Sequence, residues 1–263
     1  MKKGEFPALK EYETPEREKE MEQKLPKAIG WSINFFLERH LFLLNALQRE
    51  GSRGRAQQIK GLDRKQAYGR VLEQFKTGHH LEALSIMDIS VRYIELDVDA
   101  LDYIPKEERD TGWKEERKRT KEKRDTLVYH RDRLIEKEPR LRKEYTKKDF
   151  GDWAKETISG QQSSLKEETD ENNRGNLLER MLVLNKVLTS APLSKEDVST
   201  LLFEINYEVA LYREGLGEVV VNYLLGEKIQ ENQLLDYLGN IIKFRQFQVG
   251  VESGEWIKIK GRT

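Results

Sequence analysis

The chain has 263 residues, of which 36% are charged and 37% hydrophobic, and none is cysteine. Without cysteine there is no disulfide framework, no thiolate nucleophile and no cysteine-ligated zinc site. The 47 basic and 47 acidic residues give a net charge of zero, so no global field attracts nucleic acid or a membrane surface. This length suits one large domain or two small ones.

Residues 1–25 are polar and predict a flexible N-terminal arm. Thr14 before Pro15 is typical of an N-cap followed by proline in the first helical position, so a short charged helix is expected to run to Gln23. The chain begins without an apolar signal region, which together with the absence of cysteine favours a cytoplasmic location.

Residues 28–47 are the most apolar stretch, and their apolar side chains recur at helical spacing. The stretch has the length of a membrane span, but the charged or titratable residues 38–40 lie at its centre, where charge is costly in a bilayer. We therefore expect a central helix of a soluble protein, with Phe35 and Leu44 largely buried and His40 in or beside the core.

Residues 51–61 are flanked by glycine and predict a loop, with Gly51 as the cap of the preceding helix. Asp63 predicts the N-cap of a helix that runs to about Phe75. A further helix is expected from about His80 until Pro105 ends it. Its core face consists of apolar residues at helical spacing: Leu81, Leu84, Met87, Val91, Ile94, Val98 and Leu101.

Residues 111–145 predict a long charged helix with few apolar residues. Arg117, Arg124 and Arg131 occupy positions where a coiled coil has apolar groups. The remaining narrow seam favours a projecting helix that rests on another surface, and Pro139 predicts a break near its end. The seam follows a seven-residue spacing: Trp113, Leu127, Leu134 and Leu141.

Residues 159–174 are the best linker in the chain, because they are polar apart from one large apolar residue. Helices are expected over 177–188, from a capping box at Ser194 and Asp197 to about Leu225, and over 232–247. The alternating tail, residues 255–260, predicts a strand added to another surface, such as that of a partner.

Together these patterns predict an all-α fold, a helical bundle in two lobes with a long charged projecting helix. We divide the chain into the N-terminal arm (1–25), an N-terminal helical lobe that carries the charged helix (26–158), a linker (159–174) and an acidic C-terminal helical lobe with a short tail (175–263).

The zero net charge conceals an uneven distribution. Residues 49–76 hold eight basic and three acidic residues, residues 106–148 hold seventeen and eleven, and residues 166–236 hold seven and fourteen. A glycine-flanked basic loop can bring its arginines and its backbone close to a phosphate, although the same residues also suit a solvated surface. The predicted nucleic-acid-binding residues are Arg53, Arg55, Lys60, Arg64, Lys65 and Arg70.

In the long helix, glutamates alternate with basic residues, so internal ion pairs are expected to use much of its positive charge. Acids on one face of the preceding helix predict a solvated face or one that docks a basic surface: Asp88, Glu95, Asp99 and Asp102. His79, His80 and Glu82 lie near these acids, but no typical metal-ligand spacing occurs.

The remaining motifs of catalysis are missing or ordinary. The chain has no Glu-x-x-His pattern of di-iron proteins and no glycine-rich phosphate loop, so we expect no metal and no cofactor. Glu204 and Glu208 read as a surface pair one helical turn apart.

Arg124 and His130 have five residues between them, and Asp125 directly follows the arginine. This spacing resembles the Arg-x(4–6)-His motif of HEPN-domain ribonucleases, which are all-α and usually act as dimers. The resemblance covers seven residues and implies that Arg124 holds a phosphate while His130 assists attack by the ribose hydroxyl.

The first hypothesis is a non-catalytic helical interaction subunit of a larger nucleoprotein assembly, such as a prokaryotic defence or phage complex. Its partners would be other protein subunits and, through the basic loop, an RNA or DNA backbone, with no membrane. The alternatives are a metal-independent HEPN-like ribonuclease that uses Arg124 and His130, and a pure protein–protein scaffold.

Overall fold

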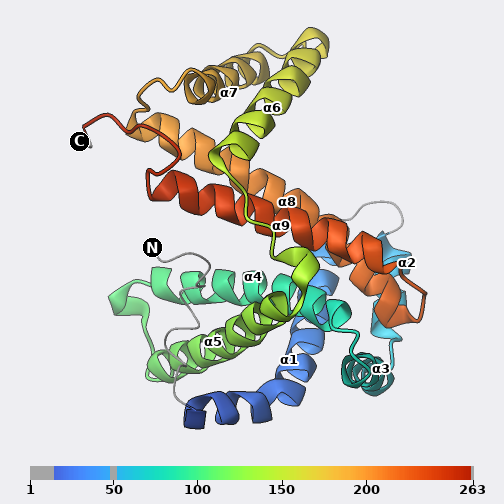
Figure 1. The fold of residues 1–263 in the computed structure, drawn as a ribbon. Coiled ribbons are helices and arrows are strands. Elements are labelled where there is room, and N and C mark those ends of the chain that lie inside the picture. Colours follow the sequence, from blue (N-terminus) through green and yellow to red (C-terminus); the bar gives the residue numbers. More distant parts are fainter. Residues whose placement is uncertain (1–14, 48–51, 262–263) are drawn as a thin grey trace. The chain divides into compact units, whose positions relative to one another are not determined.

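The computed structural model describes residues 15–47 and 52–261. Over these ranges the chain forms α-helices joined by turns, two short 3-10 segments and one isolated β-bridge (Figure 1), which confirms the all-α class. The elements are α1 (Pro15–Leu47), α2 (Ser52–Lys60), α3 (Arg64–Lys76), α4 (Leu81–Tyr103), η2 (Lys106–Glu108), α5 (Trp113–Lys137), η3 (Pro139–Leu141), α6 (Lys147–Glu167), α7 (Glu171–Leu188), α8 (Lys195–Leu225) and α9 (Glu231–Glu252).

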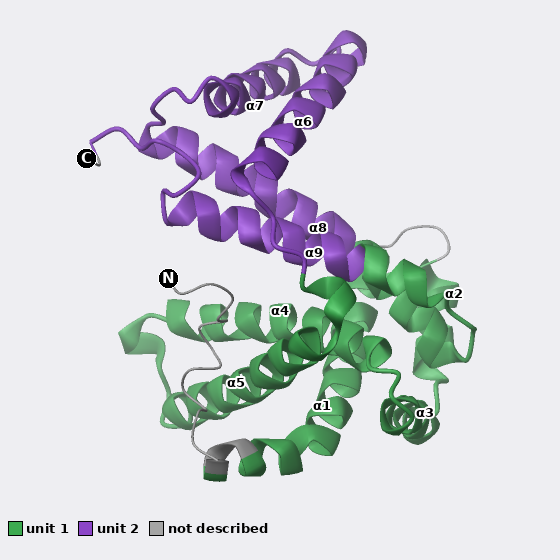
Figure 2. Cartoon of the chain, viewed as in Figure 1, with its two compact units in different colours: residues 1–142, 214–236 green, residues 143–213, 237–263 purple. Residues whose placement is uncertain are grey.

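The helices form two compact units, whose boundaries differ from those of the predicted lobes (Figure 2). Unit 1 comprises residues 1–142 and 214–236, and unit 2 comprises residues 143–213 and 237–263. Helix α8 therefore begins in unit 2 and ends in unit 1, and α9 begins in unit 1 and ends in unit 2. Local composition does not show that residues 214–236 return to unit 1. The predicted division of the chain at one polar segment, residues 159–174, therefore misses this arrangement.

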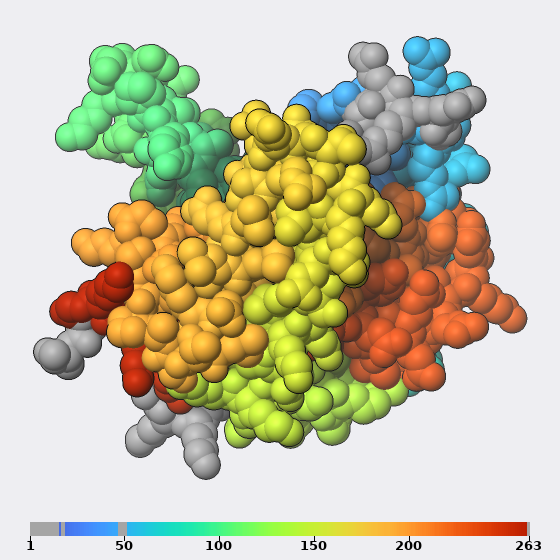
Figure 3. Space-filling view, turned by 90° about the horizontal axis from the view of Figure 1, so that it is seen from above, coloured from blue at the N-terminus to red at the C-terminus, as the bar shows by residue number. Residues whose placement is uncertain are grey.

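The predicted linker, residues 159–174, is mostly helical, because α6 ends and α7 begins within it. Asp170 caps α7, and the guanidinium of Arg174 donates at 2.9 Å to each of the backbone carbonyls of Leu165 and Glu168 at the end of α6. The segment is polar because it is the exposed connection of two helices that pack side by side, visible from another direction in Figure 3.

The predicted N-terminal arm is in part helix. Residues 1–14, with the predicted cap Thr14, lie outside the described residues, but α1 begins at Pro15 as expected and continues through Pro26. Met21 is buried against Tyr129 of α5. One buried apolar side chain among many charges is a weak pattern, which is why the sequence suggested an arm.

Helix α4 is the core helix of unit 1 and contacts α1, α3 and α5. Its predicted core face is confirmed at six of the seven positions, and Leu101 is half-buried. The burial extends further than predicted, because Ser85, Asp88 and Ser90 are buried as well. The hydroxyl of Ser90 donates at 2.9 Å to the backbone carbonyl of Ser32, so α1 and α4 approach closely.

The buried side of α1 differs from the predicted one. Phe35 and Leu44, predicted to be largely buried, are half-buried, and Phe35 lies beside the fully buried side rather than on it. The buried side chains are Ile29, Ile33, Phe36 and Leu37. Phe35 and Phe36 lie about 100° apart around the helix, and a segment that is apolar on several sides does not show which side faces the core.

Three local signals form as predicted. The carboxylate of Asp63 accepts hydrogen bonds of 2.9 and 3.2 Å from the first turn of α3. The Ser194 N–H donates to Asp197 at 2.8 Å, and the Asp197 N–H donates to the Ser194 hydroxyl at 3.1 Å, so the capping box forms. Pro139 follows the end of α5. The predicted cap Gly51 lies outside the described residues.

Unit 2 is built around a cluster of aromatic rings whose neighbouring centroids are 5.2 to 5.8 Å apart. The rings belong to Phe150, Trp153, Phe244, Phe247 and Trp256. The tail that carries Trp256 forms a parallel bridge between Leu193 and Ile259. Leu193 donates to the Lys258 carbonyl at 2.8 Å and accepts from the Lys260 N–H at 2.9 Å. The extended tail therefore pairs with this chain itself.

Candidate nucleic-acid interface

The predicted basic loop is helix α2, so the loop prediction was wrong. Ser52, Ala56 and Ile59 are buried and α2 contacts α1. These residues repeat at helical spacing and give α2 an inner side, which compensates for its glycine content. The basic residues of the segment are consequently held at defined positions around a helix.

Two of the six predicted site residues serve the fold of unit 1. The guanidinium of Arg55 donates to the side-chain carbonyl of Asn222 and lies 3.6 Å from the carboxylate of Glu218. The guanidinium of Arg70 donates to the backbone carbonyl of Leu224. The partners are 167 and 154 residues away along the chain, so no local signal in the sequence indicates these contacts.

The other four predicted site residues are exposed. Arg64 lies 3.2 Å from the carboxylate of Glu38. Over the described ranges, no hydrogen bond or ion pair joins the side chain of Arg53, Lys60 or Lys65 to an acid; we call these three residues the cation trio. The part of the basic segment that stays available for a phosphate is therefore the outer side of α2 and the start of α3.

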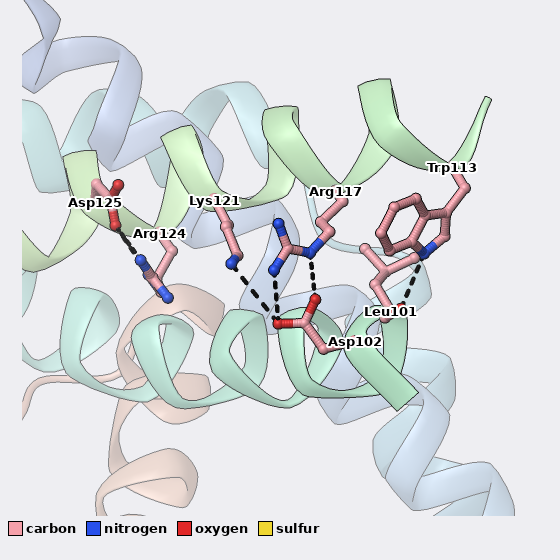
Figure 4. Close-up of polar contacts among 7 residues, drawn as sticks. All are labelled: Leu101, Asp102, Trp113, Arg117, Lys121, Arg124 and Asp125. Atoms are coloured by element: carbon pink, nitrogen blue, oxygen red, sulfur yellow. Dashed lines mark hydrogen bonds and ion pairs between the residues drawn. The ribbon is translucent and has the colours of Figure 1, made fainter. Parts of the chain in front are cut away.

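Arg117 and Lys121 of α5 face Asp102 of α4 (Figure 4). The guanidinium of Arg117 donates to both carboxylate oxygens of Asp102, and Lys121 lies 3.6 Å from the same carboxylate. The hydrogen bond from Arg117 holds the pKa of Asp102 below its ordinary value. The Trp113 indole N–H donates to the Leu101 carbonyl at 2.9 Å. At Asp102 the acidic face of α4 therefore docks a basic surface of the same chain, whereas Glu95 pairs with Arg92 of its own helix and Asp99 is exposed.

Fourteen residues beyond Arg117 on α5, Arg131 is buried and pairs with its neighbour on the same helix. The Nε and Nη2 atoms of Arg131 both lie 2.7 Å from the carboxylate of Asp132, and Asp88 of α4 is buried with them. Burial disfavours the charged guanidinium, but Asp132 and Asp88 together raise the pKa of Arg131. The first half of α5 rests exposed on α4 as expected, whereas its second half is part of the core.

The pair that resembles a HEPN motif does not form one site within the chain. Arg124 is half-exposed and donates to its neighbour Asp125 at 2.9 and 2.6 Å. His130 is buried beside the backbone of Met21, and burial lowers the pKa of its imidazole to about 4. Six residues turn a helix by about 240°, so the two side chains leave α5 on different sides. A ribose hydroxyl reaches His130 only if the core opens.

The residues considered as metal ligands lie at the start of α4. His79 is exposed, and the ring of His80 packs 4.7 Å from the ring of Phe75. Burial raises the pKa of Glu82, and burial together with the charge of Glu82 raises the pKa of Tyr223 to about 12. Over the described ranges no group of three or more His, Asp or Glu residues is placed to hold a metal ion.

His40 is a core-edge residue of α1. Its Nε2 atom lies 3.4 Å from the carboxylate of Glu218, and its ring is 5.5 Å from that of Phe36. Burial lowers the pKa of the imidazole, Glu218 opposes this shift and the nearby Arg55 adds to it. Glu218 thus connects α1 and α2 to α8 within unit 1.

Glu204 and Glu208 of unit 2 were predicted to form a surface pair, but both are at least partly buried. Glu204 is 5% exposed, Arg180 Nε lies 3.0 Å from its carboxylate and Gln161 donates to it at 3.1 Å. Burial raises the pKa of Glu204 and of Glu208. Glu204 therefore joins α6, α7 and α8, a role that its spacing from Glu208 did not indicate.

Comparison of the chain with protein-family models, with curated proteins and with solved structures finds no match. In the part of the chain that the structure describes, no helix combines the length and apolar character needed to cross a membrane.

Proposed function

We propose that this protein is a non-catalytic helical interaction subunit of a nucleoprotein assembly, and that it contacts a nucleic-acid backbone through the cation trio Arg53, Lys60 and Lys65. The observation that carries the proposal is the exposure of these three cations on a helical segment that is poor in acids, since Asp63 is the one acid between residues 52 and 72. A cytoplasmic location is part of the proposal, because the absence of cysteine fits a reducing compartment.

The trio suits a phosphate backbone better than a base edge. Arginine and lysine bind phosphates by charge, and their counterion release makes the affinity depend on salt. Gln57 and Gln58 are exposed on the same helix and add neutral donors, whose contacts to phosphate or sugar carry no sequence information. Binding with little sequence preference and strong salt dependence is the expected behaviour.

The test is fluorescence anisotropy of labelled RNA and DNA across a range of salt concentrations. The triple variant R53A/K60A/K65A should weaken binding and flatten the log–log salt slope by about two to three, because each lost phosphate contact removes roughly 0.7 to 0.9. The control is K114A/K118A/K123A, which removes three exposed cations from α5 of the same unit. It should leave the slope nearly unchanged.

Equal slopes for the wild type and the trio variant would remove the interface and favour a protein–protein scaffold. The same samples, incubated without metal, test the ribonuclease alternative. RNA cleavage that is lost in H130A would favour a HEPN-like enzyme, and we expect retention of the RNA without cleavage.

A further inference from the structure

Two exposed glycines lie beside the cation trio. Gly54 follows Arg53 on α2, and Gly69 lies one helical turn after Lys65 on α3. Among the described residues, no side chain or distant backbone atom lies within 4 Å of the position that a Cβ would occupy at either glycine. An exposed glycine inside a helix is less favourable than alanine, and the described packing of this chain supplies no reason for either one.

Residues 52–76 themselves present no exposed aromatic ring. Tyr68 and Phe75 are the aromatic residues between positions 52 and 76, and both are half-buried. The ring of Tyr68 covers Gly30 of α1, and the ring of Phe75 packs against His80. Proteins that bind single strands stack bases on aromatic rings, whereas a duplex keeps its bases stacked and presents a continuous phosphate surface.

We infer that α2 and the start of α3 lie with their backbones directly against the phosphate backbone of a double-stranded nucleic acid, approaching closest at Gly54 and Gly69. This inference rests on the proposed function, since the cation trio supplies the attraction. Arg53 and Lys60 are about 10 Å apart along α2, so both can reach phosphates of one duplex while the bare helix surface between them meets the backbone. Duplex RNA and duplex DNA share this chemistry.

The inference predicts opposite signs for stability and binding. G54A and G69A, singly and together, should raise the melting temperature or leave it unchanged, because alanine favours the helix. The same changes should weaken binding of a duplex by about fivefold or more, because each methyl group holds the helix away from the phosphates. The matched control is G160A/G175A in α6 and α7, whose glycines are exposed, helical and without neighbours within 4 Å.

Binding is measured by anisotropy with a blunt duplex DNA, a blunt duplex RNA and a single strand of equal length, and melting by circular dichroism. Support requires weaker duplex binding for G54A/G69A, wild-type binding for G160A/G175A, and a preference for a duplex over the single strand. The tighter of the two duplexes identifies the source of the backbone.

Wild-type duplex affinity of a folded G54A/G69A protein would overturn the close approach and leave the cation trio as the interface. Single strands bound as tightly as both duplexes would overturn the duplex assignment. If R53A/K60A/K65A binds every probe like the wild type, the proposed function fails and this inference fails with it, so the two failures are distinguishable.

Discussion

Two segments of unit 1 carry a similar surplus of positive charge and use it differently. Residues 52–76 hold seven basic and two acidic residues, and α5 holds ten basic and six acidic residues. In α5 six of the ten basic side chains pair with acids of the same helix or of α4, from the exposed Asp102 to the buried Asp132. In residues 52–76 the cation trio projects outward instead.

The difference shows that net charge is a poor guide to a binding surface and that the position of the acids decides. An exposed ion pair contributes little to stability, but it removes the field that would attract a phosphate. On α5 each turn brings a glutamate or aspartate next to a cation, and α4 adds an acidic face. On α2 no acid occurs between Ser52 and Lys60, so the charges of Arg53 and Lys60 remain available to a partner, while Arg55 pairs with Glu218 of α8.

The largest loss of stability is expected from a substitution in the buried second half of α5. R131A removes the buried positive charge beside the carboxylates of Asp132 and Asp88, and it should lower the free energy of unfolding by about 3–5 kcal/mol, because the negative charge of these buried carboxylates is then less well compensated. Urea denaturation followed by circular dichroism measures this loss.

R117A is the control on the same helix, and its loss should be clearly smaller because its pair with Asp102 is exposed. The variant R131M/D132N, which removes both charges of the buried pair, should recover part of the stability lost in R131A. A loss below about 1 kcal/mol in R131A would mean that the second half of α5 contributes no more to the core than its exposed first half.

The second effect concerns pH and the imidazole of His130. Its pKa falls from the ordinary 6.5 to about 4 in the fold, because burial disfavours the charged ring and Lys137 and Lys24 add to this effect. Between these pH values the unfolded chain binds a proton that the folded chain does not, so stability decreases as the pH falls from 6.5 towards 4. The contribution reaches at most about 3 kcal/mol.

H130F removes this titration and leaves the carboxylates unchanged. The difference in unfolding free energy between the two proteins should therefore move in favour of H130F as the pH is lowered from neutral to about 4, approaching the same 3 kcal/mol. Denaturation series at several pH values measure the difference, and its slope is independent of any constant loss from packing a larger ring. Parallel pH profiles would show that His130 is accessible to solvent, as a nuclease requires.

Helices and their ends could be predicted where the signal is local. Asp63, the Ser194–Asp197 box and Pro139 act within one turn of themselves, and all three form as expected. The prediction failed for α2 and for residues 159–174, where glycine, serine and glutamine resemble a loop. There the helix is stabilised by a buried side or by packing against a neighbouring helix, and neither is visible in local composition.

The candidate site could be predicted as a set of residue types but not as a geometry. The basic segment was identified from its charge, and four of its six predicted residues are exposed. The sequence did not indicate that Arg55 and Arg70 bind the end of α8, because a contact across more than 150 residues leaves no periodic pattern. Glu204 was missed for the same reason, since its partner Arg180 lies on another helix.

The smallest effect separates two neighbouring arginines of α2 that the sequence treats alike. R55A removes the hydrogen bond to Asn222 and the pairing with Glu218, so it should lower the free energy of unfolding by about 1–2 kcal/mol. R53A removes an exposed side chain and should change it by less than about 0.5 kcal/mol. Each variant loses one positive charge, so a purely electrostatic contribution of α2 would predict the same stability for both.

A double-mutant cycle of R55A with N222A should show coupling, whereas R53A with N222A should be additive, because Arg55 contacts Asn222 and Arg53 does not. Equal losses of unfolding free energy in R53A and R55A would mean that Arg55 does not hold α8 more firmly than Arg53 does. The assignment of the cation trio to the outer side of α2 would then be wrong as well.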